Sequence, residues 1–292
     1  MSGNADLYCV MGNPVEHSRS PWIHARFAEL TGEALRYERR LVSLTGFAQA
    51  VHDFAATGGC GCNVTVPFKL EAAGLASHCS ERVLLAGAAN TLTFSAGAIV
   101  ADNTDGLGLV ADLTQNAGFD LAGRDVLLIG AGGAAAGALG PLLAAKPRCV
   151  VVANRTLSRA QTLVAAHAAL AVANHTELLA TSPLALEADF DLVINASASS
   201  LVGDAVPVAA TVLRSGALAY DMMYGPAAQG FLDWASTHGA QARDGLGMLV
   251  EQAAEAFAIW RGVRPPGAQV LAELRALLVA PSLAAGHAHS GH

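Results

Sequence analysis

The sequence predicts an α/β fold with two domains: an α/β substrate domain and a Rossmann-type, doubly wound dinucleotide-binding domain. Three observations support this prediction. The 292 residues suffice for two domains of ordinary size. Apolar runs typical of strands alternate with helical patterns, and one such run leads directly into a glycine-rich turn. Hydrophobic residues make up 53% of the chain and charged residues 14%, which excludes a disordered protein.

Strands and helices alternate up to about residue 106. Helical spacing starts at Ser20-Pro21 and stops before Gly32, because proline suits the first turn of a helix and glycine its end. A second helix runs over 47–58. Strands are predicted over 7–11, 37–42 and 60–66, and a hairpin joins 91–94 to 98–101. This region is expected to be the substrate domain.

A second alternation starts near residue 124. A continuous apolar run over 126–129 is typical of a strand buried on both faces. Further strands are predicted over 149–153, 191–194 and 217–220, with helices between them. Two further helices are expected over 248–260 and 269–278. We therefore predict a substrate domain over 1–106 completed by 244–280, a dinucleotide-binding domain over 107–243 and a flexible tail over 281–292.

Charge and composition exclude several classes of function. The net charge of −7 argues against nucleic acid as a partner. The uncharged span 126–145 is long enough for a membrane helix, but its glycines argue against one, and the N-terminus lacks the pattern of a secretory signal. Five cysteines at irregular spacing argue against a disulfide framework, and nothing completes Cys60-Gly61-Cys62 as a metal site. We expect a cytoplasmic protein without a metal.

The glycine-rich turn matches the dinucleotide fingerprint. Gly130-x-Gly132-x-x-Ala135 follows a predicted strand and opens a predicted helix. The first glycine permits a tight turn, and the second lets the backbone approach a pyrophosphate. The free N–H groups of the helix N-terminus then favour the phosphates. The predicted cofactor contacts in the turn are Gly130, Gly132, Gly133 and Ala134. A glycine-rich turn without a ligand is the alternative.

The end of the next strand predicts NADP rather than NAD. An NAD site would have an acidic residue there to bind the ribose hydroxyl. This chain has Asn154, Arg155 and Thr156, with Arg159 one turn later. A guanidinium pairs with a 2′-phosphate, whereas a carboxylate repels it. An arginine that only faces solvent is the alternative, but it would not explain the missing acid.

Several longer motifs follow one another in order: Gly12-Asn13-Pro14-x-x-His17-Ser18-x-Ser20-Pro21, Asn63-Val64-Thr65-Val66-Pro67-Phe68-Lys69, Gly87-Ala88-Ala89-Asn90-Thr91, Asp102-Asn103-Thr104-Asp105-Gly106, Tyr220-Asp221-Met222-Met223-Tyr224 and Asp244-Gly245-Leu246-Gly247-Met248. With the glycine-rich turn, they make the chain resemble the shikimate dehydrogenase family over about residues 8–278. The resemblance implies reversible reduction of 3-dehydroshikimate to shikimate by NADPH.

The resemblance assigns Lys69 and Asp105 as the catalytic pair. Lys69 and Lys146 are the only lysines among 17 basic residues, and a lysine can transfer a proton where an arginine effectively cannot. From the residues alone, Lys69 could also be a solvated loop lysine. Asp105 could equally be a helix N-cap, because a helical run begins beside it.

The remaining site residues are also implied by the resemblance. Ser18 and Ser20 would bind the substrate carboxylate, although Ser20 before Pro21 also suits an N-cap. Neutral hydrogen-bonding side chains suit a polyol, because each hydroxyl that stays unpaired on burial costs about 1–3 kcal/mol. The other substrate residues are Asn63, Thr65, Asn90, Tyr224 and Gln252, and further cofactor contacts are Ser197, Met222, Gly245 and Met248.

The chain departs from the family pattern at Ser197-Ala198, where a Thr-Ser pair is usual, and over 225–230, which lacks a common Pro-Thr-Pro. Two alternative functions stay open. One is a quinate or dual quinate/shikimate dehydrogenase, against which Arg155 argues. The other is a non-catalytic module that senses shikimate or NADP, against which the intact Lys69 and Asp105 argue. A monomer or a homodimer is expected.

Overall fold

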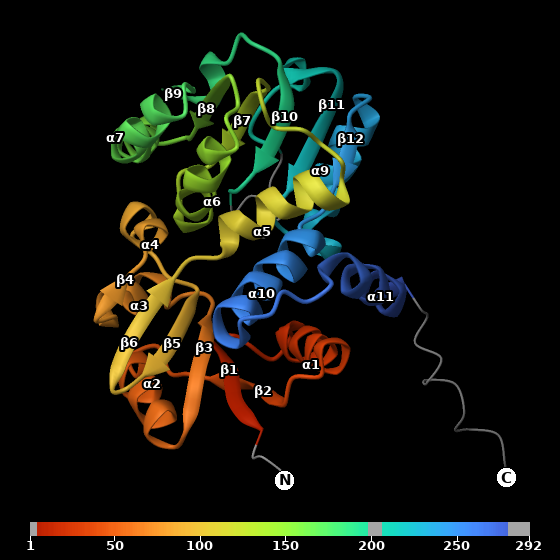
Figure 1. Ribbon diagram of the computed structural model, residues 1–292. Helices are drawn as coiled ribbons and strands as arrows, with labels where there is room; N and C mark the ends of the chain where they lie inside the picture. Colours follow the sequence, from red (N-terminus) through yellow and green to blue (C-terminus); the bar gives the residue numbers. More distant parts are fainter. Residues whose placement is uncertain (1–4, 198–205, 280–292) are drawn as a thin grey trace, which may run out of the picture.

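The computed structural model describes residues 5–197 and 206–279. Its two six-stranded sheets lie one above the other in Figure 1, with helices α5 and α10 between them. The predicted flexible tail over 281–292 and the departure at Ala198 lie outside the described residues. The predicted α/β architecture with two sheets is confirmed.

The first sheet is mixed, with strand order β2-β1-β3-β5-β6-β4. Strand β1 runs parallel to β2 and β3, whereas β5 and β6 form the predicted antiparallel hairpin. The strands are β1 Asp6–Gly12, β2 Leu35–Leu41, β3 Gly59–Val64, β4 His78–Cys79, β5 Thr91–Ser95 and β6 Ala98–Asp102. The helices that accompany them are α1 Ser20–Thr31, α2 Phe47–Ala56, α3 Lys69–Leu75 and α4 Glu81–Ala86.

The second sheet is entirely parallel, with strand order β12-β11-β10-β7-β8-β9. This is the Rossmann order, in which ligands bind where the strand order reverses, here between β7 and β10. The strands are β7 Asp125–Ile129, β8 Cys149–Ala153, β9 Glu177–Thr181, β10 Phe190–Asn195, β11 Leu213–Asp221 and β12 Gln241–Arg243. The helices are α6 Gly133–Ala144, α7 Leu157–Ala173 and α9 Gln229–Thr237, with short 3₁₀ turns at Pro183–Ala185, Ala210–Val212 and Gly225–Ala228.

Helix α5 (Asp105–Ala111) connects the two sheets and packs closely on two other helices. It continues into a π-helical turn, Asp112–Asn116. A Cβ at Gly108 would lie 2.5 Å from the backbone nitrogen of Gln252 in α10 (Leu246–Arg261), and a Cβ at Gly106 would overlap the Gly137 carbonyl in α6. Only glycine permits these two approaches, so α5 is fixed between α10 and α6.

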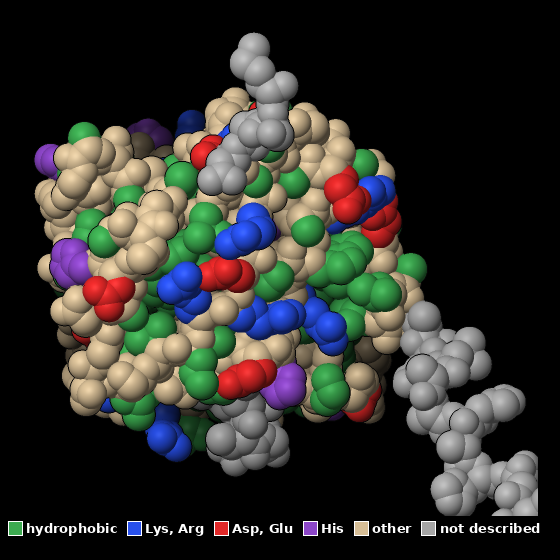
Figure 2. All heavy atoms as spheres, turned by 90° about the horizontal axis from the view of Figure 1, so that it is seen from below, with side chains coloured by type: hydrophobic (Ala, Val, Ile, Leu, Met, Phe, Trp, Pro, Cys, Tyr) green, Lys and Arg blue, Asp and Glu red, His purple; other side chains and the backbone are tan. Residues whose placement is uncertain are grey.

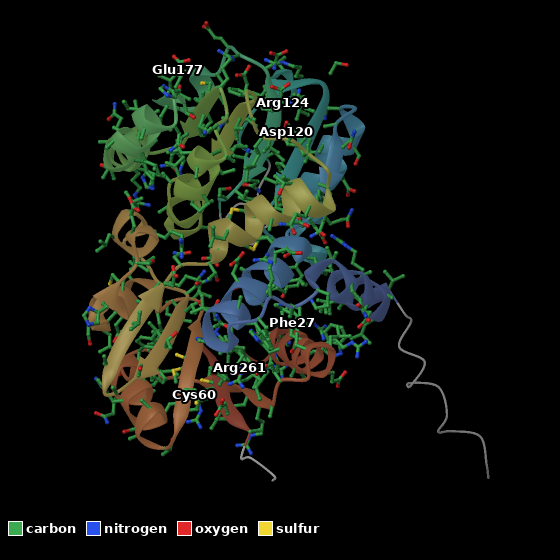
Figure 3. The ribbon with its side chains drawn as sticks, viewed as in Figure 1. Phe27, Cys60, Asp120, Arg124, Glu177 and Arg261 are labelled. Atoms are coloured by element: carbon green, nitrogen blue, oxygen red, sulfur yellow. The ribbon has the colours of Figure 1, made fainter. Side chains whose placement is uncertain are left out.

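Helix α10 also forms the core beside the first sheet. Ile23 and Phe27 of α1 pack with Phe257 of α10 and with helix α11 (Gly267–Val279), and Figure 3 shows Phe27 where α1 meets α10. At the far end of α10, Arg261 forms ion pairs with Asp6 and Glu33. The C-terminal helices therefore return to the first sheet.

Some local predictions need correction. The strand predicted over 60–66 ends at Val64, because a turn closed by the Phe68 N–H and the Thr65 carbonyl (3.1 Å) interrupts it before α3. The N-cap interpretation of Ser20 is wrong: Arg19 holds the N-cap position, and Ser20 is the first residue of the helix. Pro21 and Gly32 stand at its start and end as predicted.

The uncharged span 126–145 folds as β7 followed by α6. Among the described residues, no helix combines the length and hydrophobicity that crossing a membrane requires. Basic and acidic side chains lie side by side on the face of the molecule in Figure 2. Both signs of charge are thus interspersed on that face.

The packing of α5 on α10 yields a stability prediction. Gly108→Ala forces a methyl group against the Gln252 backbone, so we expect it to lower the free energy of unfolding by about 1–3 kcal/mol. The control is Gly230→Ala in α9, where an added Cβ meets nothing within 4 Å, so stability should be unchanged or slightly higher. Urea unfolding midpoints measure both effects. Equal midpoints for the two variants would contradict the close approach.

Candidate active site

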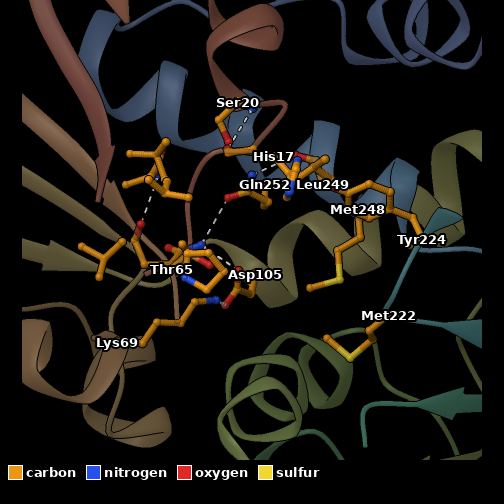
Figure 4. A pocket seen from close by; sticks show the side chains of 18 residues that line it. His17, Ser20, Thr65, Lys69, Asp105, Met222, Tyr224, Met248, Leu249 and Gln252 are labelled. Carbon is orange, nitrogen blue, oxygen red and sulfur yellow. Dashed lines mark hydrogen bonds and ion pairs between the residues drawn. The ribbon is translucent and has the colours of Figure 1, made fainter. Parts of the chain in front are cut away.

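One cavity of about 330 Å³ lies where the first sheet, α5, α10 and the end of β11 meet. All of the predicted catalytic and substrate-binding residues line it: Ser18, Ser20, Asn63, Thr65, Lys69, Asn90, Asp105, Tyr224 and Gln252. Three predicted cofactor contacts, Met222, Gly245 and Met248, also line it. Figure 4 shows Met222 and Met248 across the cavity from Lys69. The structure therefore brings together residues that are up to 234 positions apart, from Ser18 to Gln252.

An ion pair stands at the centre of this cavity. The Lys69 Nζ lies 2.5 Å from Asp105 Oδ2, and Figure 4 shows the two side chains directed toward one another. Each residue begins a helix, α3 and α5 respectively, so its backbone position is fixed. The side chain of Lys69 is 27% exposed and that of Asp105 10%, so the ammonium group is reachable from the cavity while the carboxylate is largely enclosed.

The Asn90 side chain fixes the orientation of Asp105. Its Nδ2 donates to Asp105 Oδ1 (2.8 Å) and to Gln252 Oε1 (3.3 Å), and its Oδ1 accepts from the Thr104 backbone N–H (2.8 Å). Asn90 is 3% exposed. The second carboxylate oxygen of Asp105 is thereby left for Lys69.

A second amide, Asn63, extends this network behind the cavity. Its Nδ2 donates to the Asn90 carbonyl and to Thr91 Oγ1, both at 3.1 Å, and its Oδ1 accepts from the Tyr37 hydroxyl at 2.7 Å. Tyr37 stacks on His24 with ring centroids 4.1 Å apart. Burial lowers the pKa of His24 to about 3, and Asn63 offsets part of this shift.

The loop before α1 carries the two serines. Ser18 Oγ accepts the Ser20 backbone N–H at 3.3 Å, and Arg39 donates from Nε (3.0 Å) and Nη2 (2.6 Å) to the Ser18 carbonyl. Arg39 holds the loop from outside, because its contact is with the backbone and its side chain does not line the cavity. The serine hydroxyls are placed beside the start of a helix, a position that suits an anion.

The glycine-rich turn has room for a ligand. Gly130 has φ +110°, and a Cβ there would lie 3.0 Å from the Ala196 backbone, so glycine is needed for the turn. At Gly132 and Gly133 an added Cβ would meet nothing within 4 Å. Helix α6 starts here without a side-chain cap, which leaves first-turn N–H groups for phosphate oxygens. Ala135 is fully buried, as the fingerprint requires.

The residues after β8 are arranged as an anion site would need. Asn154 Nδ2 donates to the Thr156 carbonyl at 2.8 Å and thereby shapes the turn. Arg155 and Arg159 are exposed. Within the part of the chain that the structure describes, neither guanidinium forms an ion pair with a carboxylate. Both are thus available to a phosphate.

The other predicted cofactor contacts lie at the ends of β10 and β11. Ser197 Oγ donates to Asn195 Oδ1 at 2.7 Å, just after β10. The Gly245 N–H donates to the Met223 carbonyl at 2.8 Å, and a Cβ at Gly245 would overlap the Met222 carbonyl. Gly245 thus lets the start of α10 lie directly against the end of β11.

The prediction from sequence missed several residues of the site. His17 and Leu249 line the cavity, as do Val10, Pro14, Val15 and Val64. His17 stands beside Ser18 in the first motif, and Leu249 precedes Gln252 by less than one helical turn, so proximity to predicted residues was an available signal. No such signal marked Tyr37, because it supports the site through its hydrogen bond to Asn63, and the two residues lie on different strands, β2 and β3.

Comparison with known proteins decides the family. Family models match residues 10–92 (shikimate dehydrogenase substrate binding domain), 112–203 (shikimate / quinate 5-dehydrogenase) and 245–275 (shikimate 5′-dehydrogenase C-terminal domain). The shikimate dehydrogenase (NADP(+)) of Acidovorax sp. (strain JS42) is 72% identical over 280 residues, which cover 96% of this chain and 99% of the relative. The chain belongs to the shikimate dehydrogenase family.

Solved structures agree with this assignment. Shikimate 5-dehydrogenase from Thermus thermophilus in complex with NADP(H) and shikimate has a TM-score of 0.80 at 28% identity, covering 93% of this chain and 99% of that one. The Ael1 enzyme from Pseudomonas putida has a TM-score of 0.86 at 46% identity, covering 92% and 98%. Both solved structures thus share the overall fold of this chain.

The buried His24 predicts a pH dependence of stability. Its folded pKa of about 3 lies below the ordinary 6.5, so the unfolded chain binds a proton that the folded chain does not. The free energy of unfolding should therefore fall as the pH drops from 6.5 toward 3, by about 1.4 kcal/mol per pH unit from this residue.

The measurement is the slope of unfolding free energy against pH between pH 6 and pH 4. His24→Phe should reduce this slope by the stated amount, and His52→Gln on the exposed face of α2 should leave it unchanged. Identical slopes for the wild type and His24→Phe would show that His24 titrates normally.

Proposed function

We propose that this protein catalyses the reversible, NADP-dependent reduction of 3-dehydroshikimate to shikimate, with Lys69 and Asp105 as its proton-transfer pair. The observation that carries the proposal is the 2.5 Å Lys69–Asp105 contact inside a cavity otherwise lined by neutral hydrogen-bonding and apolar side chains. NADPH, when bound, supplies the hydride that goes to the ring carbonyl carbon.

The residues of the chain act on the proton and on orientation. Lys69 Nζ donates its proton to the carbonyl oxygen as negative charge develops there, and takes it back in the reverse reaction. Asp105 orients Lys69 and accepts a hydrogen bond from the substrate hydroxyl. Asn90 keeps the carboxylate from rotating. Much of the rate enhancement comes from holding both reactants in position.

Recognition of the substrate is divided between two kinds of groups. Ser18 and Ser20 bind the ring carboxylate with their hydroxyls. Neutral side chains receive the ring hydroxyls, because each buried hydroxyl needs a partner. We assign this role to Asn63, Thr65, Asn90 and Gln252, with Tyr224 as a further contact.

The dinucleotide lies along the turn 130–134 and the residues after β8. The free space at Gly132 and the uncapped start of α6 support the pyrophosphate position. Arg155 and Arg159 bind the 2′-phosphate, supported by Asn154 and Thr156. Ser197, Met222, Gly245 and Met248 complete the cofactor contacts where β10, β11 and α10 meet.

The domain organisation follows from these roles. We assign residues 1–106 and 244–280 to substrate binding and 107–243 to NADP. We expect a monomer or a homodimer. All five cysteines are free, which supports a reducing compartment such as the cytoplasm.

The test is absorbance of NADPH when purified protein meets shikimate and NADP, with quinate and NAD run in parallel. Turnover should require shikimate and NADP. Efficient use of quinate would favour a dual-specificity enzyme instead. If NADP binds without turnover of any pair, the protein is a sensor and not a dehydrogenase.

The same assay tests the proton-transfer pair. Lys69→Ala should lower kcat about 10²–10⁴-fold, the usual contribution of a positioned acid, while shikimate binding largely survives. The control is Lys146→Ala: Lys146 is the only other lysine in the sequence and is exposed, so this variant should retain wild-type kcat. Wild-type turnover by Lys69→Ala would refute the assigned role.

The cofactor preference has its own test. Arg155→Asp replaces a phosphate-binding guanidinium with a repelling carboxylate, so the KM for NADP should rise about 10–100-fold relative to that for NAD. Arg36→Asp makes the same charge change at an exposed position on β2 and serves as the control. An unchanged ratio in Arg155→Asp would exclude the phosphate contact.

A further inference from the structure

A buried ion pair joins the two points at which the chain crosses between its sheets. One crossing runs from α5 through the π-helical turn that begins at Asp112 and on to β7. The other runs from β12, which ends at Arg243, into α10 (Figure 1). Arg243 donates to Asp112 from Nε (2.8 Å) and from Nη2 (2.5 Å). Neither residue lines the cavity.

The Asp112 carboxylate is the centre of a larger cluster. Its side chain is 0% exposed, and that of Arg243 is 20% exposed. The Tyr220 hydroxyl donates to Asp112 Oδ2 at 2.8 Å and also accepts the backbone N–H of Met248 at 3.3 Å. A Cβ at Gly247 would overlap Asp112 Oδ1, so the carboxylate lies directly against the first turn of α10.

These contacts hold one side of the cavity. We define the cofactor wall as the cavity-lining residues Met222, Gly245 and Met248. Met222 and Met248 lie across the cavity from Lys69 in Figure 4. Met222 comes two residues after Tyr220 in the sequence, and Gly245 comes two residues after Arg243. The backbone N–H of Met248 donates to the Tyr220 hydroxyl. Each member of the wall is therefore attached to a member of the cluster.

We propose that Asp112, Arg243 and Tyr220 are positioning residues that hold the cofactor wall in place, and so set the affinity for the dinucleotide. This inference rests on the proposed function. Most substrate residues, namely Ser18, Ser20, Asn63, Thr65, Lys69 and Asn90, lie on the strands, helices and loops of the first sheet. Tyr224, just after β11, and Gln252, on α10, lie close to the cluster in the chain, so we expect it to affect cofactor binding more than substrate binding.

Stability alone does not account for the cluster. A buried ion pair is often no more stabilising than apolar side chains of the same volume, because desolvation offsets the attraction. The local helix also departs from α-geometry at Asp112, and such π-turns are frequent at functional sites. The ion pair instead fixes how the two crossing segments lie relative to one another, because a bidentate arginine defines both their distance and their orientation.

The second sheet contains a comparable ion pair, at the opposite ends of its strands, that serves as a control. Arg214, at the start of β11, forms ion pairs with Asp125 and Asp191 at the starts of β7 and β10. Asp125 is 6% exposed, so this too is an arginine on a buried aspartate. Neither Arg214 nor its aspartate partners line the cavity.

The experiment compares Arg243→Gln with Arg214→Gln by isothermal titration with NADP and, separately, with shikimate, together with their melting temperatures. Arg243→Gln should raise the Kd for NADP about tenfold or more and leave the Kd for shikimate within about twofold. Arg214→Gln should leave both Kd values within about twofold. The double variant Asp112→Asn/Arg243→Gln removes the unpaired buried charge and should regain part of the NADP affinity.

If Arg243→Gln does not fold, Tyr220→Phe tests the inference instead, because it removes only one hydroxyl from the cluster. This variant should raise the Kd for NADP about threefold and leave the Kd for shikimate unchanged. Unchanged NADP affinity in the Arg243 and Tyr220 variants would overturn the inference. So would a similar loss in Arg214→Gln, or an equal loss for both ligands. Failure of the proposed function is distinct, because it shows in the wild-type assay.

Discussion

The close approach of α5 to α10 is the constraint on which the cavity depends. Gly108 lets the two helices meet backbone to backbone, and Gly106 does the same between α5 and α6. Asp105 at the start of α5 and Gln252 on α10 consequently both reach Asn90, which immediately precedes β5 of the first sheet. A side chain at either glycine would separate the helices and pull these three polar groups apart. Helix packing thus determines the position of the Asp105 carboxylate.

Around this carboxylate, neighbouring side chains of the protein make the hydrogen bonds that hold it in place. Asn90 uses both ends of its amide, and Asn63 is held by Tyr37 from behind. An amide that is satisfied on both sides has one orientation, so Asp105 presents one oxygen to Lys69 and is held by the other. Such preorganisation matters for catalysis, because the groups need not reorganise as charge develops on the substrate.

Sequence could predict most of this fold and much of the site, for identifiable reasons. Strands β7 and β8 are continuous apolar runs, and the turn after β7 has a glycine pattern with a known physical logic, so both were predictable. The Ser20 N-cap was wrong, because the helix begins at Ser20 itself and Pro21 is therefore its second residue and not its first. The Tyr37–Asn63 and Asp112–Arg243 contacts join residues 26 and 131 positions apart, and no local pattern encodes such pairings.

The distribution of charge in the cavity explains why a single lysine can serve as the proposed proton donor. Among the lining residues that the structure describes, Lys69 is the sole lysine or arginine, so Asp105 has one cationic partner there. A guanidinium placed in the cavity to bind the substrate carboxylate would compete for Asp105, and its pKa would prevent it from replacing Lys69 as a proton donor. Hydroxyl groups and a helix start can bind the same carboxylate without that competition. Arg155 and Arg159, the exposed arginines that we propose bind the 2′-phosphate, lie instead after β8 and outside this cavity.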